Sequence, residues 1–156
     1  MRYVAAIDGG GTKTRCIIGD DTGNILADCL AGPSNHQTVG AEQVELVLTE
    51  LFQRSLKESG LTEDQIEFVC LGLAGADLEQ DFILLNGICR KIFKNIPFKV
   101  LNDAWLILKS GLTTPWGAVS ICGTGANAAV ISHKGEKAIL RALSYELGNY
   151  GGGEYI

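Results

Sequence analysis

The sequence predicts an α/β fold with a mixed sheet, and two observations carry this prediction. Short apolar runs separated by tight turns come first, which is typical of a three-stranded antiparallel meander. Amphipathic segments of helical period then alternate with buried apolar runs, which indicates helix–strand units that extend a sheet in parallel. The chain of 156 residues, 46% of them hydrophobic and 20% charged, has the length and composition of one ordinary folded domain.

The individual elements follow from these patterns. Apolar residues spaced three and four apart predict a helix over about 40–58, which ends at the C-cap Gly60. We expect a second helix, capped by Asp77, whose apolar stripe runs to Phe93 with Pro97 just past it, and a short third helix that runs to Gly111. Strands are expected at 3–7, 15–19, 25–30, 66–73, 98–101, 116–122, 126–132 and 136–142, with an irregular loop at 32–36.

Charge and cysteine content exclude several classes of protein. The formal net charge is −5, and a pI of about 5.0 argues against a nucleic-acid or anionic-membrane partner, since both attract basic surfaces. We see no apolar run of membrane-spanning length and no signal peptide, so a cytoplasmic protein is expected. The five cysteines lack the spacing of a zinc site, and we expect buried, reduced thiols.

The strongest chemical signal is the segment Asp8-Gly-Gly-Gly-Thr-Lys-Thr14. Three glycines and a hydroxyl residue in a tight turn can present several backbone N–H groups to one anion, as phosphate-cradling loops do. A strand follows the turn, unlike a P-loop or a dinucleotide fingerprint, where a helix follows. Asp8, at the strand end, is placed to hold a hydrated Mg²⁺ beside those phosphates. The alternative is a purely structural glycine hairpin with Asp8 as a turn residue.

A second glycine turn, Gly123-Thr124-Gly125, also lies between two predicted strands. By itself it fits a plain hairpin, but two such turns can grip a polyphosphate from opposite sides. Asp103 follows a strand, at the kind of edge where open α/β sheets bind ligands, so it could accept a proton from an attacking hydroxyl. The alternative is a simple helix N-cap. Similarly, Asn35 and His36 could bind a polyol or be ordinary loop residues.

Taken together, these motifs resemble one known group of proteins. Besides the first glycine segment, the resemblance rests on Leu71-Gly-Leu-Ala-Gly-Ala-Asp77, Asn102-Asp-Ala104 and Cys122-Gly-Thr-Gly-Ala-Asn127, in that order. The chain resembles the N-terminal lobe of an N-acetylglucosamine kinase and of the related BadF-BadG-BcrA-BcrD-type ATPases, named for benzoyl-CoA reductase components. Both have the actin/hexokinase/heat-shock-70 ATPase fold. The resemblance implies a ribonuclease-H-like lobe that binds ATP and Mg²⁺ in a cleft.

The resemblance also implies a role for each motif. Asp8 would be the metal-associated aspartate, and Asp103 would be the base that takes the proton from the sugar hydroxyl. The first phosphate loop would be Gly10, Gly11, Thr12 and Lys13, and the second would be Gly123, Thr124 and Gly125. The amino-sugar site would comprise Asn35, His36, Gly75 and Asn127.

Two departures from the family pattern are visible. Amino-sugar kinases usually carry a Gly-Asp-Glu-Gly-Ser segment where this chain has Gly148-Asn-Tyr-Gly-Gly152, so both acidic positions differ. The chain also ends where the interdomain helix of the family would begin. We therefore expect residues 1–156 to be an N-terminal lobe without its C-terminal lobe, inactive or nearly so when isolated.

Three functions stay open on this reading. The first is ATP-dependent phosphorylation of an N-acetylhexosamine such as N-acetylglucosamine, in the intact protein. The second is an ATPase activator of a benzoyl-CoA reductase or 2-hydroxyacyl-CoA dehydratase system, which would need thiolates for a shared cluster. The third is a non-catalytic sugar or nucleotide sensor. The expected partners are a small-molecule sugar and ATP, with a homodimer as a further candidate.

Overall fold

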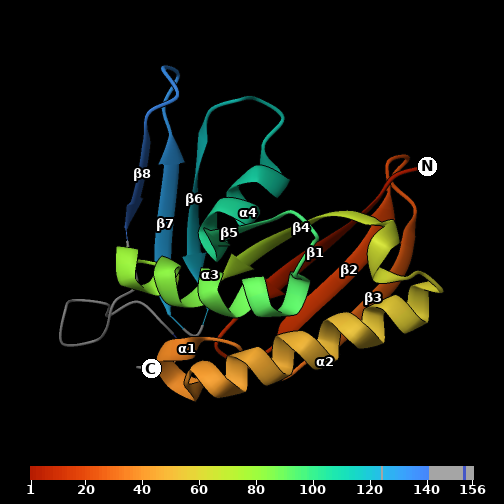
Figure 1. The fold of residues 1–156 in the computed structure, drawn as a ribbon. Coiled ribbons are helices and arrows are strands. Elements are labelled where there is room, and N and C mark those ends of the chain that lie inside the picture. The colour runs from red at the N-terminus through yellow and green to blue at the C-terminus, as the bar shows by residue number, and fades with distance from the viewer. Residues whose placement is uncertain (124, 141–152, 154–156) are drawn as a thin grey trace.

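The computed structural model describes residues 1–123, 125–140 and 153, and its larger sheet has five strands in the order β3-β2-β1-β4-β5 (Figure 1). β1, β2 and β3 pair antiparallel, whereas β4 joins β1 in parallel and β5 joins β4 in parallel. The predicted mixed sheet, a three-stranded meander extended by helix–strand units, is therefore confirmed. The five strands are β1 (Tyr3–Gly9), β2 (Thr14–Asp20), β3 (Ile25–Ala31), β4 (Ile66–Leu73) and β5 (Phe98–Asn102).

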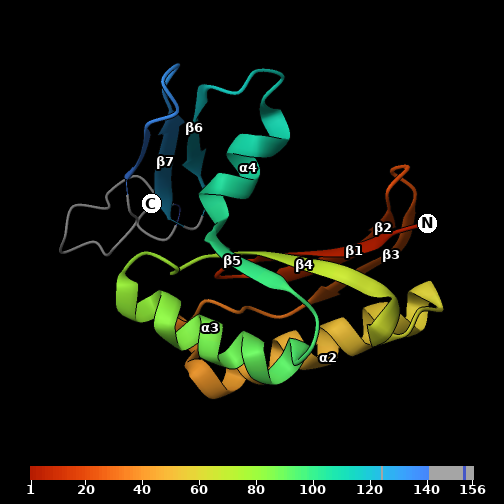
Figure 2. The same ribbon diagram turned by 45° about the horizontal axis from the view of Figure 1, so that its top comes forward.

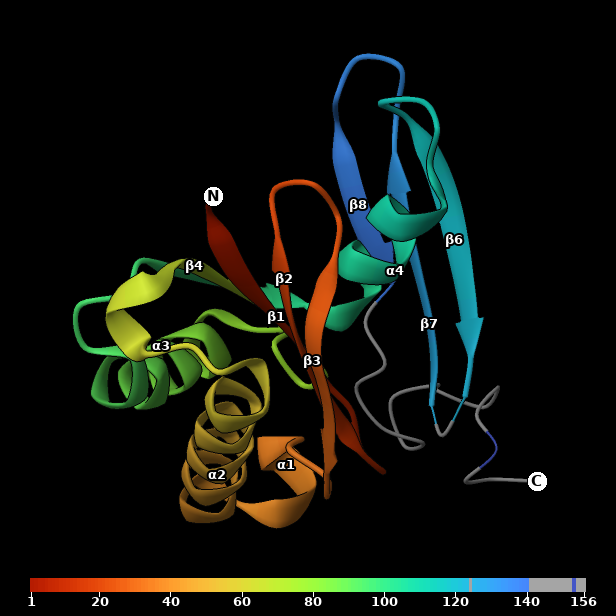
Figure 3. The ribbon, with the colours of Figure 1, turned by 90° about the vertical axis from the view of Figure 1, so that its right-hand side faces the viewer.

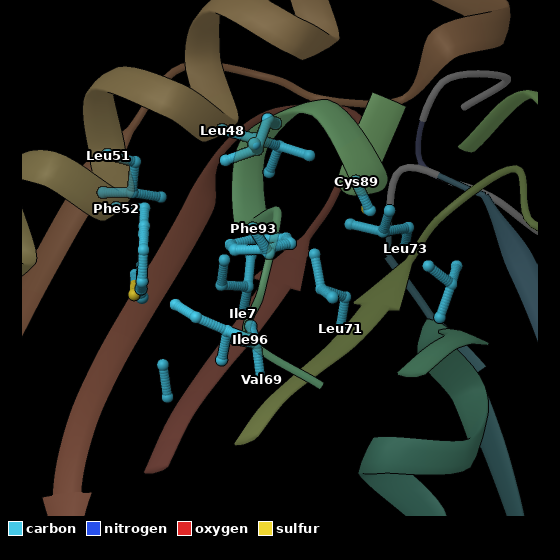
Figure 4. Close-up of a cluster of buried hydrophobic side chains, with 14 of the residues drawn as sticks. Ile7, Leu48, Leu51, Phe52, Val69, Leu71, Leu73, Cys89, Phe93 and Ile96 are labelled. Atoms are coloured by element: carbon cyan, nitrogen blue, oxygen red, sulfur yellow. The ribbon is translucent and has the colours of Figure 1, made fainter. Parts of the chain in front are cut away.

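Two helices, α2 (Ala41–Ser59) and α3 (Glu79–Phe93), cover one face of this sheet (Figure 1). Residues alternate along β1, so that Ala5 and Ile7 are buried beneath the helices while Val4 faces away and is exposed. Figure 4 shows the resulting core, in which side chains of both helices meet those of β1 and β4. The rings of Phe52 and Phe93 join the two helices edge to face, with centroids 5.1 Å apart.

A second sheet stands apart from the first and has three antiparallel strands in the order β6-β7-β8 (Figure 3). Its strands are β6 (Gly117–Cys122), β7 (Ala126–Ile131) and β8 (Lys137–Leu140). Helix α4 (Asp103–Gly111) lies along it (Figure 2) and buries Ala104 and Leu108 in a cluster with Ala129 and Ile131. This small cluster is separate from the main core and attaches the second sheet to α4.

The structure differs from the sequence-based expectations at two helix starts. The loop predicted at 32–36 ends in a one-turn helix, α1 (His36–Val39), because the Asn35 side chain accepts the N–H of Gln37 at 3.0 Å. Helix α3 begins one residue later than the expected Asp77 cap implies, with Leu78 as its N-cap. There the Asp81 carboxylate accepts the N–H of Leu78 at 2.8 Å. The predicted C-cap Gly60 is confirmed and has a left-handed backbone.

The strand directions bring the loops of interest to one edge of the larger sheet. β1, β3, β4 and β5 run the same way, so the loops that follow them emerge together. These loops carry the first glycine turn, the Asn35–His36 segment, the Gly75 segment and the start of α4. Among the described helices, none is long and apolar enough to cross a membrane.

Candidate active site

The first glycine turn is closed by a hydrogen bond from the Gly10 N–H to the Lys13 carbonyl at 2.9 Å. The glycines of this turn differ in what surrounds them. A Cβ on Gly9 would overlap the Ser34 hydroxyl and lie 2.6 Å from the Leu73 side chain, so glycine is required there by close packing. Gly11 has nothing within 4 Å of an added Cβ and no positive φ, so packing within the described residues does not require glycine at this position. Thr12 and Lys13 are exposed on the same turn.

Buried hydroxyl groups hold this turn against the loop that follows β3. The Thr14 hydroxyl hydrogen-bonds with the Gly32 carbonyl at 2.7 Å and with the Ser34 hydroxyl at 2.8 Å. The Ser34 N–H in turn donates to the Gly10 carbonyl at 3.1 Å. Both hydroxyl side chains are fully buried. The glycine turn therefore has a fixed position relative to the Asn35–His36 segment, which immediately follows Ser34.

Asp8 and Asp103 lie on the same side of the sheet, with Gly72 between them. Gly72 pairs with Asp8 in the register of β1 and β4, and paired residues point to the same face. A Cβ on Gly72 would lie 2.6 Å from the Leu106 side chain and 3.2 Å from the Asp103 Cα. The absence of a side chain at Gly72 thus lets the first turn of α4 rest on the sheet beside Asp8.

The Asp103 carboxyl has a raised pKa. Burial is the largest cause, and the negative charge of Asp8 adds to it, whereas the backbone N–H of Ala104 acts in the opposite direction. The same Ala104 N–H donates to the Asp103 Oδ1 at 2.9 Å. A carboxylate with a raised pKa is a stronger base than an ordinary one, which suits a group that must accept a proton.

The Asn35–His36 segment is held in contact with Gly75. Gly75 has a φ of +81°, and an added Cβ there would lie 2.5 Å from Asn35 Oδ1 and 3.2 Å from the His36 ring. His36 Nε2 lies 3.0 Å from Asp81 Oδ1, and both side chains are about nine-tenths buried. His36 Nδ1 is buried without a hydrogen-bond partner among the described residues. The predicted sugar-site residues Asn35, His36 and Gly75 are therefore brought together, with His36 directed toward α3.

Asp81 connects this segment to the loop after β4. Burial alone would raise the pKa of the Asp81 carboxyl. The hydrogen bonds from the N–H groups of Leu78 and Asp77 and from the His36 ring together lower the pKa by more than burial raises it, so the net shift is downward. Asp81 therefore stays ionised and keeps both connections. Sequence reasoning missed Asp81, because it took Asp77 as the N-cap and the observed N-cap, Leu78, is not a typical capping residue.

The second glycine turn follows β6. The Gly123 N–H donates to the Gly125 carbonyl at 3.0 Å, and the Gly123 carbonyl accepts the Gly153 N–H at 2.7 Å. As at Gly11, an added Cβ on Gly123 would meet nothing within 4 Å. Thr124 and the segment 148–152, where the sequence departs from the amino-sugar kinases, lie outside the described residues. Cys122, expected to be buried, is exposed beside this turn.

Asn127, on β7, joins the second sheet to the first. Its Nδ2 lies 3.4 Å from Asn102 Oδ1, and its own Oδ1 is buried without a partner among the described residues. Asn102 and Asp77 also bond to each other, at 3.0 Å. Sequence reasoning missed this pair and the role of Gly72, because residues 25 or more positions apart give no local signal of their contact.

The strand order and the loops at the edge of the larger sheet are those of the actin-like ATPase fold. The chain superposes on a ROK family glucokinase from Streptomyces griseus, solved in complex with glucose and AMPPNP, with a TM-score of 0.66. The sequence identity is 18%, and the match covers 90% of this chain and 49% of that one. At this identity the likeness shows the fold alone.

The chain belongs to the BadF/BadG/BcrA/BcrD ATPase family, whose pattern it matches over residues 6–155. It is 31% identical to an N-acetylmuramic acid/N-acetylglucosamine kinase of Clostridium acetobutylicum over 153 residues, which is 98% of this chain and 50% of that protein. It is 32% identical to an N-acetyl-D-glucosamine kinase of Dictyostelium discoideum over 159 residues, covering 96% and 50% respectively. The chain thus spans about half the length of the curated relatives it matches.

Proposed function

We propose that this chain is part of an ATP-dependent kinase that phosphorylates an N-acetylated hexosamine. The observation that carries the proposal is the placement of Asp103 beside Asp8, at the edge of the sheet where the first glycine turn also emerges. Phosphoryl transfer needs a phosphate cradle, a metal-binding carboxylate and a base for the attacking hydroxyl in one place. The similarity to two curated amino-sugar kinases supports the substrate class.

The two glycine turns are the proposed phosphate cradle. Among the described residues, nothing lies within 4 Å of a Cβ added at Gly11 or Gly123, and neither glycine has a positive φ that would require it. A close-approaching ligand accounts for glycine at both positions, since it would occupy the space that a methyl group takes. The Gly10 N–H closes the first turn by its bond to the Lys13 carbonyl, so the N–H groups proposed to face the phosphates on that turn are those of Gly11 and Lys13.

Asp8 fits a Mg²⁺ ion bound with the nucleotide. Its carboxylate is exposed at the end of β1, directly before the glycine turn, and carboxylate oxygen is a preferred ligand of Mg²⁺. The ion, when bound, would neutralise charge on the transferring phosphoryl group. Asp103 would accept the proton of the sugar hydroxyl, and its partly buried position keeps water from competing for that proton.

The sugar is proposed to bind between the Asn35–Gly75 contact and Asn127, which bonds to Asn102 at the start of α4. The amide groups of the two asparagines can exchange hydrogen bonds with hydroxyl and acetamido groups. His36 would contribute through its buried bond to Asp81, which holds the Asn35 segment against the Gly75 loop. Its unpartnered Nδ1 is a further group that a ligand could satisfy.

ADP release by the intact protein tests this proposal. With ATP and Mg²⁺, turnover should depend on N-acetylglucosamine or N-acetylmuramic acid and be much lower with glucose. Asp103→Asn should lower kcat about 10²–10⁴-fold, which is the usual contribution of a positioned base. Asp64→Asn is the matched control, because Asp64 is an exposed aspartate in the first turn of a short helix remote from the site.

Other outcomes would point to other functions. ATP turnover that is indifferent to every sugar would favour the activator ATPase, and the exposed Cys122 beside the second glycine turn would then be the residue to examine. ATP or sugar binding without turnover would favour a sensor. A loss of less than tenfold in Asp103→Asn would make Asp103 a helix-capping residue and contradict its role as the base.

A further inference from the structure

Two buried polar side chains lie at the junction of β5 and α4, where the candidate base Asp103 begins the helix. Asp77, in the loop after β4, is 7% exposed, and Asn102, the last residue of β5, is 3% exposed. The Asn102 Nδ2 donates to Asp77 Oδ1 at 3.0 Å. A buried polar pair of this kind is costly to maintain unless its hydrogen bonds are satisfied, so its geometry is well determined.

This bond fixes which way the Asn102 amide points. Because Nδ2 faces Asp77, Oδ1 faces the other way and accepts the N–H of Ala104 at 3.0 Å. Asn102 is thereby the N-cap of α4, whose first residue is Asp103. A reversed amide would place an NH₂ group against the Ala104 N–H, which is repulsive, and would remove the cap.

The same oxygen also reaches the second sheet. Asn127 Nδ2 lies 3.4 Å from Asn102 Oδ1, so the orientation set by Asp77 serves a contact with β7 as well. The start of α3 does not depend on Asp77 for its acceptor, since Asp81 Oδ2 accepts the Leu78 N–H at 2.8 Å. Through its bond to Asn102, the Asp77 carboxylate contacts the junction of β5 and α4.

We infer that Asp77 is a positioning residue for the phosphoryl-transfer site: by holding the Asn102 amide, it fixes the first turn of α4 and with it the Asp103 carboxylate. This inference rests on the proposed function for its effect on turnover. Its structural part, the dependence of the α4 cap on Asp77, can be measured without any activity.

An exchange of the two side chains tests the inference in the intact protein. Asn102→Asp keeps the cap acceptor but sets one carboxylate against another, so kcat should fall at least tenfold while KM for ATP changes less than threefold. The double variant Asp77→Asn with Asn102→Asp restores a donor–acceptor pair of reversed polarity and should recover most of that loss. Asp77→Asn alone supplies the remaining corner of the double-mutant cycle.

Hydrogen exchange at the Ala104 amide gives the activity-independent measurement. Because the Ala104 N–H also donates to Asp103 Oδ1 at 2.9 Å, the measurement is made in an Asp103→Ala background. There Asp77→Leu, which removes the acceptor for Asn102, should speed exchange at Ala104 at least tenfold, and Asp77→Asn should leave it nearly unchanged. Unchanged Ala104 exchange in Asp77→Leu, or a double variant no better than Asn102→Asp, would overturn the inference. If Ala104 exchange responds as expected but the wild type phosphorylates no sugar, the kinase proposal fails while the positioning of α4 by Asp77 stands.

Discussion

Replacing Gly11 with alanine should weaken ATP binding and leave folding intact, whereas the same change at Gly9 should destabilise the fold. The two positions are separated by one residue but differ in their surroundings. A Cβ at Gly9 would overlap the Ser34 hydroxyl and lie 2.6 Å from the Leu73 side chain, while a Cβ at Gly11 would meet nothing within 4 Å. Overpacking of this kind costs about 1–3 kcal/mol, and we expect that loss for Gly9→Ala.

Gly11→Ala should change the free energy of unfolding by less than about 0.5 kcal/mol, as is usual for exposed positions without strain. If a phosphate occupies the open space, the methyl group displaces it, and we expect ATP affinity to fall about 10–100-fold, which corresponds to roughly 1.4–2.8 kcal/mol. Calorimetric titration with ATP and Mg²⁺ measures the affinity, and urea unfolding measures the stability.

Gly87→Ala is the matched control, because Gly87 lies in α3 with nothing within 4 Å of an added Cβ. It should bind ATP normally and be slightly more stable, since alanine is favoured over glycine inside a helix. Wild-type ATP affinity in Gly11→Ala would refute the reasoning, because the open space at Gly11 would then have no connection with the nucleotide.

Three further predictions concern stability. Thr14→Val should cost about 1–3 kcal/mol in urea unfolding, since it removes a buried hydroxyl bonded to Gly32 and Ser34. Phe93→Ala should cost about 3–5 kcal/mol, because Phe93 is fully buried between α2 and the sheet. The raised pKa of Asp103 means that the folded state binds its proton more tightly than the unfolded state, so its contribution to stability falls as pH rises from the ordinary value of 3.8 through the raised one. In urea unfolding measured across this pH range, the Asp103→Asn variant should lack the pH-dependent part of the stability that Asp103 contributes. A pH dependence equal to that of the wild type would contradict this prediction.

Much of the fold could be predicted because its signals are local. The meander, the long helix ending at Gly60 and the glycine turns each depend on residues close together in sequence. The convergence of the loops after β1, β3, β4 and β5 then follows from strand direction alone. Strand direction thus places Asp8 and Asp103 at one edge of the sheet, whereas their position on either side of Gly72 depends on packing.

The remaining features depend on contacts between distant segments. The sequence does not tell whether β6, β7 and β8 extend the larger sheet or form their own, because strand pairing is decided by packing of the whole chain. The bond between Asp77 and Asn102 joins residues 25 positions apart and has no local pattern. The exposure of Cys122 also depends on which face of β6 is covered.

The junction between β5 and α4 has a mechanical consequence. Asn102 ends the strand and Asp103 begins the helix, with no residue between them, and α4 is packed against both β4 and the second sheet. A change in the direction of α4 would therefore move the second sheet and its Gly123 turn relative to the Gly10 turn, and would move Asp103 least because Asp103 is the first residue of the helix. The separation of the two glycine turns thus depends on this one strand-to-helix connection, at which the proposed base Asp103 lies.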